Sequence, residues 1–475
     1  MTARLDPEAV ADHIADVIPL TGRGRPREAS AEEQEAFRRS QEAPEDQPRA
    51  SGVDPTEVPN HLLSVPGLVG HIARYITKTA RFPQPLLSLA AALGVVGTVA
   101  GRITSGPTKS GTHLYLLTLA PTGGGKAHPA KIGRRLLRAA NMSEMMGPGR
   151  FQSETAVYQT LGAKPQLICF MDEFGSYLQK MNDPRQSSSH ERAISGALRQ
   201  FWGASFDTVD PPAWAASSNT KLLPIHSPSL SLFGMSVHEE FYAALQSADI
   251  ANGFLNRFLV LPTMNKPEEV EPELDDDDVP PALIEGLQRV GYTPAGWDAA
   301  NSGRSDWKPY RRFTWAGDEV SQAYKGLQRS VRDHPEGSKL LSRTAEMAVR
   351  LATIRAIGRD AMNPSVAGPL VSLEDFAWAA ELAMWCGQRM VDDAASYMVE
   401  SDHQGRVNEI LRHIKGAKRG QLTQTDLYRK VKHKFNAAAI TDVLRSLQES
   451  EQIEITRHRA DGAKKPTDVI RYLGG

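Results

Sequence analysis

The sequence predicts an α/β fold in which a parallel sheet lies between helices, followed by a helical region and a small carboxyl-terminal module. Three observations predict it. A short apolar run, His113–Leu119, leads into a glycine-rich turn and then into a segment with helical spacing. A second apolar run, Leu167–Met171, ends in two carboxylates. Residues 403–475 combine three helix-like segments with two strand-like ones.

Composition limits the class of protein. The chain has 475 residues, of which 40% are hydrophobic and 23% charged, with a net charge of −1. Such a chain is typical of a globular protein of about two to four domains. Two cysteines, Cys169 and Cys386, are too few for a disulfide scaffold and favour a reducing compartment. The first residues are acidic and lack the apolar segment of a secretion signal, so we expect a cytoplasmic protein.

Residues 1–60 are predicted to form an acidic, largely flexible arm after a short helix near Asp6–Val17. They contain 7 Arg, no Lys and 13 Asp or Glu, a net charge of −6. Farther along, Phe82–Gly101 carries no charge over 20 residues, about the length of a membrane span. Its two prolines, and the lack of a second such stretch, favour a buried helix over a span, so we expect no membrane contact.

The turn after His113–Leu119 has the pattern of a phosphate-binding loop. Glycines let backbone N–H groups turn toward phosphate oxygens, and the following helix, Pro129–Asn141, adds a favourable partial charge. Lys126 is expected to reach the β- and γ-phosphates of ATP. Ala127 stands where the pattern G-x-x-x-x-G-K-[ST] has the hydroxyl that holds Mg²⁺, and a plain glycine turn with a surface lysine is the alternative. The expected nucleotide-binding residues of the loop are Thr122, Gly123, Gly124, Gly125, Lys126 and Ala127.

Asp172 and Glu173 follow the second apolar run directly. Ligands of parallel sheets bind outside the carboxyl ends of the strands, so these carboxylates are expected beside the loop. Asp172 is predicted to hold Mg²⁺ through water, and Glu173 to polarise the attacking water as a general base.

Several segments together resemble a known family. Cys169–Asn182 resembles the Walker B segment of AAA+ replicative helicases of the minichromosome-maintenance type, Asn252–Phe258 their arginine-finger segment, and Ser342–Ala352 their sensor-2 helix. Over about residues 65–400 the chain is more similar to a phage and prophage family of helicase-like P-loop proteins, usually described as a domain of unknown function. The shared segments are Val65-Pro-Gly-Leu, Ala91-Ala-Leu-Gly, Gly101-Arg, Pro121-Thr-Gly-Gly-Gly-Lys and Asp172-Glu-Phe-Gly. The resemblance implies an AAA+ ATPase of DNA replication.

Other polar residues fit this interpretation, each with an alternative. Ser236 ends the apolar strand Leu230–Ser236 and could sense the γ-phosphate or cap the strand. Arg257 either pairs internally or completes the ATP site of a neighbouring subunit, which requires a ring oligomer such as a hexamer. Arg343 and Arg350 share a helix face, so one of them could contact phosphate while the other pairs with Glu346.

The segment between Asp207 and Pro228 lies where the resemblance implies a pore hairpin. Lys221 at its turn could grip a DNA backbone, and Trp214 could stack on a base or simply pack. The acidic run of residues 268–278 holds eight carboxylates and is predicted to be a surface loop, with a metal site as the weaker alternative. Helices expected at 317–333, 337–359 and 372–400 would form a lid.

The carboxyl-terminal segment is basic, with 15 Lys or Arg and 8 Asp or Glu in residues 403–475, a net charge of +7. Helices at Gly405–Lys415, Gln424–Lys432 and Ala437–Glu449, then strands at Ile453–Arg459 and Val469–Leu473, resemble a winged helix. The third helix would enter the major groove of DNA and the wing would touch phosphate, although winged helices also dock proteins. The expected DNA contacts are Thr441, Arg445, Gln448, Arg457, Arg459, Lys464 and Lys465.

We therefore expect an acidic arm (1–60), a P-loop ATPase core (61–280), a helical lid (281–402) and a winged-helix domain (403–475). The expected function is ATP-driven DNA translocation or unwinding in phage or mobile-element replication, by a homo-oligomeric ring. The acidic arm could recruit a replication partner or mask the basic tail. The rival is a DNA-binding initiator or scaffold that binds ATP without hydrolysing it, which the absent hydroxyl at Ala127 favours.

Overall fold

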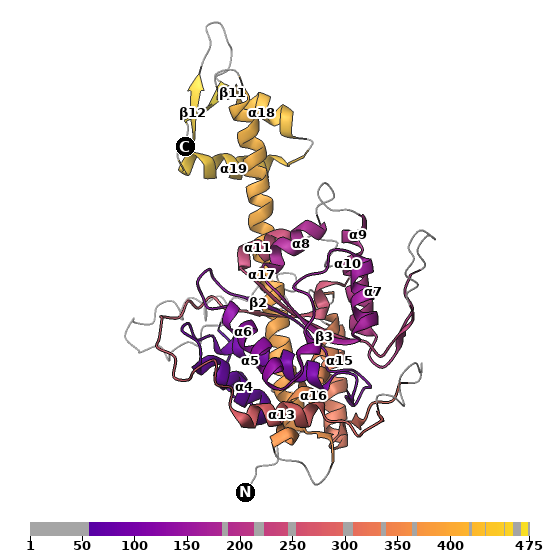
Figure 1. The fold of residues 1–475 in the computed structure, drawn as a ribbon. Helices are drawn as coiled ribbons and strands as arrows, with labels where there is room; N and C mark the ends of the chain where they lie inside the picture. Colours follow the sequence, from indigo (N-terminus) through magenta and orange to yellow (C-terminus); the bar gives the residue numbers. More distant parts are fainter. Residues whose placement is uncertain are drawn as a thin grey trace, which may run out of the picture. The chain divides into compact units, whose positions relative to one another are not determined.

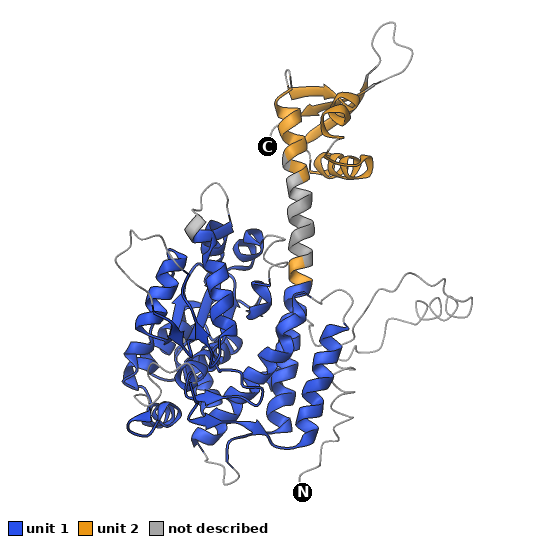
Figure 2. Cartoon of the chain, turned by 90° about the vertical axis from the view of Figure 1, so that its right-hand side faces the viewer, with its two compact units in different colours: residues 1–391 blue, residues 392–475 orange. Residues whose placement is uncertain are grey.

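The computed structural model describes residues 57–182, 189–212, 223–245, 253–297, 307–333, 339–362, 368–417, 420–432, 434–450, 452–458 and 467–473. Of the predicted acidic arm, all but residues 57–60 lies outside this part, as do Trp214, Lys221, Arg459, Lys464 and Lys465. The chain divides into two compact units, residues 1–391 and 392–475 (Figure 2). The region expected as a lid belongs to the first unit up to residue 391.

The first unit is built on a four-stranded parallel sheet with the order β3-β6-β2-β7 (Figure 1). Its strands are β2 (Tyr115–Leu119), β3 (Gln166–Met171), β6 (Ser229–Ser236) and β7 (Phe258–Pro262). All but the first residue of β3 are buried, as expected for a parallel sheet covered on both faces. The predicted α/β class with a parallel sheet is thereby confirmed.

Helices cover the two faces of the sheet. Successive residues of β6 point to opposite faces: Phe233 lies toward α5 (Pro85–Ala100), whereas Gly234 lies beneath Phe174 of α8 (Phe174–Asn182). Beyond α5 pack α4 (Gly67–Lys78), α6 (Ala127–Ala139), α13 (Pro281–Gly291) and α16 (Thr344–Met362). The other face carries α7 (Glu154–Ala163), α10 (Ile194–Gly203) and α11 (His238–Ala244) with α8.

The uncharged stretch forms the central helix of this unit. Helix α5 begins at Pro85, a residue well suited to the first helical turn, and nearly all of its residues are buried. The prediction of a buried helix is confirmed. Within the described ranges, no helix combines the length and the apolar character needed to cross a bilayer.

Shorter elements complete the unit. Strands β4 (Thr208–Val209) and β5 (Ile225–His226) form an antiparallel pair that precedes β6. Two parallel pairs link distant segments: β1 (Thr104–Ser105) with β8 (Arg311–Arg312), and β9 (Thr314–Trp315) with β10 (Leu370–Val371). Helix α15 (Asp318–Arg332) packs on α16 and matches the prediction at 317–333. The short helices are α3 (Asn60–Leu63), α9 (Ser189–Arg192), η1 (Ser143–Met145), η2 (Leu255–Arg257) and η3 (Leu341–Arg343).

Two predicted helix boundaries are wrong. The helix expected from residue 337 begins at Thr344, after the single turn η3. The helices expected at 372–400 and Gly405–Lys415 are one helix, α17 (Leu373–Lys415). No proline interrupts that segment, and a glycine such as Gly405 costs only about 1 kcal/mol within a helix.

Both cysteines lie inside the first unit. Cys169 is on β3 and Cys386 on α17, and each is buried and not disulfide-bonded. Burial raises the pKa of both thiols well above the usual value, which keeps them protonated.

The second unit has a three-stranded antiparallel sheet in the order β11-β13-β12. The end of α17 is followed by β11 (Gln421–Thr423), α18 (Gln424–Val431), α19 (Ala437–Glu449), β12 (Ile453–His458) and β13 (Thr467–Tyr472). Thr423 and Asn436 cap α18 and α19, as predicted. The core that unites the helices and strands includes Ile410, Leu427, Val443, Leu447 and Ile470.

Candidate functional site

The glycine-rich loop lies at the carboxyl edge of the sheet, between β2 and α6. Gly123 and Gly125 both have φ of +76°, the left-handed region that favours glycine. The amide of Gly124 donates to the carbonyl of Pro121 at 3.0 Å, which closes the turn. Lys126 is the last residue before α6, so the loop joins a strand to a helix amino terminus as predicted.

The loop is held from behind by the segment that links α4 to α5. Gln84, which is 3% exposed, donates from Nε2 to the carbonyls of Gly124 and Asn265, both at 2.9 Å. A Cβ on Gly125 would lie 2.5 Å from the carbonyl oxygen of Phe82. Gln84 and Phe82 were not predicted as site residues, because only the tertiary fold brings them to the loop.

Two carboxylates follow β3 at the same edge. Asp172 and Glu173 are both exposed, and Glu173 has φ of +51°, a conformation uncommon for a non-glycine residue and often found at functional sites. Oδ1 of Asp172 accepts from the amide of Glu173 at 3.0 Å. Because β6 lies between β2 and β3, the strand that ends in Asp172 is two strand spacings, roughly 10 Å, from the strand that leads into the loop.

Ser236 stands between the loop and the two acids, but its side chain is already engaged. It is 1% exposed, accepts from the amide of Gly175 at 3.2 Å, and donates to Oε2 of Glu240 at 3.2 Å. The hydroxyl therefore joins β6 to α8 and α11. This geometry agrees with the predicted alternative of a strand-end cap.

This edge offers the oxygen ligands that Mg²⁺ prefers. The carboxylates of Asp172 and Glu173 and the exposed hydroxyl of Thr122 lie on segments that leave the ends of β3 and β2, on either side of β6. Ala127, at the start of α6, supplies no ligand. The residues present thus fit a hydrated ion held chiefly by the acids and by phosphate oxygens.

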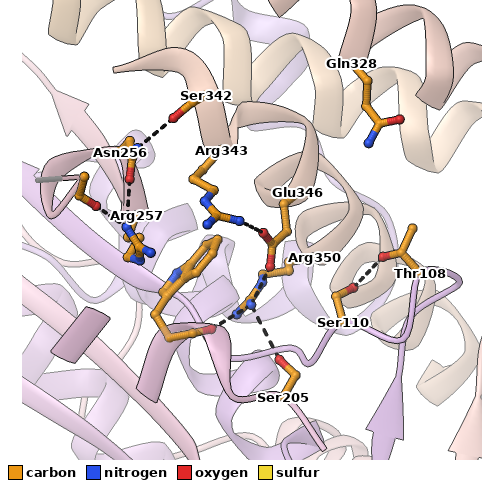
Figure 3. Close-up of polar contacts among 12 residues, drawn as sticks. Thr108, Ser110, Ser205, Asn256, Arg257, Gln328, Ser342, Arg343, Glu346 and Arg350 are labelled. Atoms are coloured by element: carbon orange, nitrogen blue, oxygen red, sulfur yellow. Dashed lines mark hydrogen bonds and ion pairs between the residues drawn. The ribbon is translucent and has the colours of Figure 1, made fainter. Parts of the chain in front are cut away.

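A second polar cluster lies at the opposite, amino edge of the sheet (Figure 3). Trp202 is fully buried, and the guanidinium groups of Arg257, Arg343 and Arg350 lie 5.6, 5.7 and 4.1 Å from its ring centre. Glu346 bonds to Arg343 at 3.1 Å and to Arg350 at 2.9 Å. We call these five residues the Trp202 cluster.

Arg350 is the structural member of the Trp202 cluster. It is 1% exposed and donates to the carbonyls of His113 and Trp202 at 2.8 and 2.9 Å, besides its bond to Glu346. The expectation that one arginine pairs with Glu346 while the other stays available for phosphate is not met in the single chain, because both bond to it. Arg343 keeps a side-chain exposure of 43%.

Arg257 belongs to the same edge, directly before β7. Nη1 of Arg257 donates to the carbonyl of Gly253 and, at 3.2 Å, to Oδ1 of Asn256. No carboxylate forms an ion pair with it among the described residues. Burial, and then the nearby charge of Arg343, lowers the pKa of Arg257, and burial likewise lowers the pKa of Arg350. The cluster is therefore short of negative charge.

The two edges are separated by the length of the strands. The loop follows Leu119 at the end of β2, whereas Arg350 bonds to His113 just before β2 begins. Five residues at about 3.3 Å each make roughly 16 Å. Lys126 and the acids are thus brought together within a chain, but Arg257 and Arg343 are not brought to them.

The acidic run of residues 268–278 is an exposed loop, as predicted, but it is tied to α4 and α6. Asp276 forms ion pairs with Lys131 and Arg135, which lower the pKa of its carboxyl, and Glu273 pairs with Lys78 at 2.7 Å. The carboxylates of Asp275, Asp276 and Asp277 lie close enough to share a cation, yet Asp276 already has two basic partners. The sequence signal for these pairs was the row of basic residues on α6.

A cavity of about 620 Å³ separates this acidic loop from the phosphate loop. Its wall includes Phe82, Gly125 and His128, and Nε2 of His128 lies 2.9 Å from Oγ1 of Thr79. Burial lowers the pKa of His128, which favours its neutral form. The cavity is next to the loop on the side where α6 begins.

In the second unit, the predicted outer face of α19 is exposed. Thr441, Arg445 and Gln448 are all exposed, while Ile440 and Val443 face the core. Thr441 Oγ1 lies 2.8 Å from the hydroxyl of Tyr428, and Arg445 lies 4.0 Å from Asp442. Arg457 on β12 is exposed and 3.9 Å from Asp468.

The fold and the two edges define a mixed α/β protein with a parallel sheet and a loop suited to phosphate. No protein-family model and no curated protein matches the chain.

Proposed function

We propose that the chain is an ATP-dependent DNA translocase or helicase that works as a ring oligomer in phage or mobile-element replication. The observation that carries this proposal is the division of the site between the two edges of one sheet. A phosphate loop and two exposed acids, Asp172 and Glu173, lie at the carboxyl edge of the sheet. A cluster of arginines short of negative charge lies at the amino edge. The carboxyl edge holds the phosphate loop and the acids but not Arg257, whereas the amino edge holds Arg257 but no phosphate loop.

A head-to-tail ring would bring the halves together. Heterologous contacts close into rings when the rotation allows it, and each subunit then presents one edge to each neighbour. Arg257 of one subunit would face the phosphates bound by the next. The resemblance to AAA+ replicative helicases implies the same arrangement.

The chemistry follows from the side chains. The backbone N–H groups of Gly123 and Gly125 and the amino terminus of α6 would bind the phosphates, with Lys126 on the β- and γ-phosphates. Mg²⁺ would supply charge neutralisation at those oxygens. Glu173 would orient and deprotonate water, and Arg257 from the neighbour would stabilise the charge that develops in the transition state. The cavity of about 620 Å³ beside Gly125 leaves room for the nucleoside.

DNA contact is proposed for two places. The antiparallel pair β4–β5 precedes β6, whose end lies between the loop and the acids, so nucleotide state could reach the segment between β4 and β5 through that strand. In the second unit, helices and an antiparallel sheet in the order β11-β13-β12 support a winged helix, with Thr441, Arg445 and Gln448 on the exposed face of α19. The excess of basic residues there favours DNA over a protein partner.

ATP hydrolysis with and without single- and double-stranded DNA tests the proposal. We expect DNA-stimulated turnover that falls at least about a hundredfold in Lys126→Ala and in Glu173→Gln, because phosphate binding and general base catalysis are lost. Lys164→Ala and Glu144→Gln remove exposed side chains of the same kinds elsewhere and should leave turnover unchanged.

The second candidate is an initiator or scaffold that binds ATP without hydrolysing it, and Ala127 is the observation that favours it. In that case Lys126→Ala would abolish ATP binding, while wild-type turnover would not exceed that of Glu173→Gln. Such a result would overturn the motor and leave the DNA-binding initiator.

A further inference from the structure

A large cavity opens beside the Trp202 cluster at the amino edge of the sheet. Its volume is about 1110 Å³, and Arg343 and Glu346 form part of its wall. Four segments border it: the turn of residues 106–110, residues 203–205 at the end of α10, helix α15, and residues 342–346 of η3 and α16. Figure 3 shows Thr108 and Ser110 on one side and Gln328 of α15 on another. We call this space the basic cavity.

Its wall carries far more positive than negative charge. Among the described residues that line it, Glu346 is the one carboxylate, and it already bonds to Arg343 and Arg350. Arg332 pairs with Asp333 at 2.9 Å. Lys109, Lys325 and Arg329 form no ion pair within the described part of the chain. The cations of the wall are Lys109, Lys325, Arg329, Arg332 and Arg343.

The cations come with hydrogen-bond donors and a distinctive turn. Thr108, Ser110, Ser205 and Ser342 add hydroxyl groups to the wall. Lys109 has φ of +61°, in the left-handed region that few non-glycine residues occupy, and its amide donates to the carbonyl of Gly106 at 3.0 Å. The turn thus presents an exposed lysine at the cavity from a less favourable backbone conformation.

We propose that the basic cavity binds the phosphodiester backbone of a single nucleic-acid strand. Cations from separate elements, together with hydroxyl donors, match a row of phosphates, and such contacts position a strand without reading its bases. The volume exceeds the usual range of about 300–1,000 Å³ for small-ligand sites. The start of β4 is adjacent, because Ser205 lines the cavity and β4 begins at Thr208.

This inference goes beyond the proposed function. It assigns to the first unit a strand-binding site in addition to the DNA contacts proposed above, and it requires neither hydrolysis nor nucleotide. A chain that binds ATP without hydrolysing it could still use this cavity, so the two proposals can fail separately.

The test is the salt dependence of oligonucleotide binding by the full chain without nucleotide, measured by fluorescence anisotropy with oligothymidine. In Lys325→Gln/Arg329→Gln we expect affinity to fall at least about fivefold at moderate salt. The slope of log affinity against log salt should become shallower by about 1.4, since each lost contact with a single strand removes about 0.7. Photocrosslinking with a thiothymidine oligonucleotide should label peptides of α15 or of the 106–110 turn.

The matched control is Arg138→Gln/Lys164→Gln, which removes the same charge from exposed positions that do not line the cavity. Its slope should stay that of the wild type. Circular dichroism melting of both double variants establishes that they are folded. For a variant that fails to fold, Lys109→Gln alone, on the exposed turn, gives the same test with an expected change of about 0.7.

Three results would overturn the inference. An unchanged slope with crosslinks only elsewhere would show that no strand enters the cavity. Inorganic triphosphate bound by Lys126→Ala, and lost on adding the cavity substitutions, with an unchanged oligonucleotide slope, would show a small-phosphate site instead. A loss of oligomer mass without a change in slope would make the cavity a contact between subunits.

Discussion

Arg350 owes its position to acceptors from two distant parts of the chain, at His113 and Trp202, and to Glu346 on its own helix. Replacing it with Met would leave Glu346 and the carbonyls of His113 and Trp202 without this partner in a buried site. We expect Arg350→Met to lower the free energy of unfolding by about 3–5 kcal/mol, as for a broken buried ion pair. Arg343→Met, at a half-exposed position, should cost less than about 1 kcal/mol. Urea denaturation compares the two, and equal losses would contradict the structural role.

His113 should make the stability of the first unit depend on pH. Burial, and then the charge of Arg350, holds the pKa of His113 well below its usual value, whereas in the unfolded chain the pKa is about 6.5. Below about pH 6.5 the unfolded chain therefore binds a proton that the folded chain does not. The neutral His113 therefore adds to the free energy of unfolding above about pH 6.5. As the pH falls below that value, this added stability is lost by about 1.4 kcal/mol per pH unit.

Urea denaturation between pH 7.5 and 5 measures this contribution, with His113→Gln as the comparison. Glutamine can still donate to the carbonyl of Trp202, which Nε2 of His113 contacts at 2.9 Å. We expect a shallower pH dependence in this variant. Parallel curves for the two proteins would show that His113 takes up its proton in the folded state.

Some site residues could be predicted from the sequence and others could not. Lys126, Asp172 and Glu173 follow apolar strands, and a local pattern is enough to place them at one sheet edge. The burial of Arg350 depends on Trp202 and His113, which lie 148 and 237 residues away along the chain. A contact between residues so far apart in the sequence leaves no local pattern from which it could be predicted.

At the scale of elements, the phosphate loop depends on the chain segment behind it. We expect Gly125→Ala to weaken ATP binding at least about tenfold, because a Cβ would clash with Phe82 and because φ of +76° disfavours alanine. Gly162→Ala, on α7 with nothing within 4 Å of the added Cβ, is the matched control. Binding of a fluorescent ATP analogue checks both. Unimpaired binding by Gly125→Ala would mean that the loop does not carry the phosphates in this conformation.

Helices and caps were predictable where the signal is local. The capped starts of α18 and α19 match the expected positions, since a side-chain oxygen satisfies amides only two or three residues away. The continuity of α17 was not predictable, because a glycine such as Gly405 can either end a helix or lie within one at a cost of only about 1 kcal/mol. The ion pairs of the acidic loop with Lys131 and Arg135 likewise join residues far apart in sequence.

At the scale of the whole molecule, the divided site makes activity a property of pairs of subunits. Lys126→Ala and Arg257→Ala should each be inactive alone, since one lacks the loop lysine and the other the arginine. Mixed in equal amounts and allowed to exchange, they should regain up to about a quarter of wild-type turnover, because half of the loops and half of the arginines remain intact.

A mixture of Lys126→Ala with Lys126→Met is the control and should stay inactive, because every subunit lacks the lysine. Steady-state ATP hydrolysis on DNA gives the readout. No recovery in the first mixture, with exchange demonstrated by mixed labels, would mean that the two edges do not meet. The sequence predicted both half-sites, but only the strand order shows that one chain holds them apart.

The two buried cysteines have a practical consequence for every such experiment. The chain contains Cys169 and Cys386 and no other thiol, and both are buried and protonated. Alkylating or fluorescent reagents attack thiolates, so the native background is nearly inert toward them. A cysteine introduced at one exposed position would then be the only one labelled in the folded chain. The slow labelling of Cys169 and Cys386 would report the rate at which the chain unfolds.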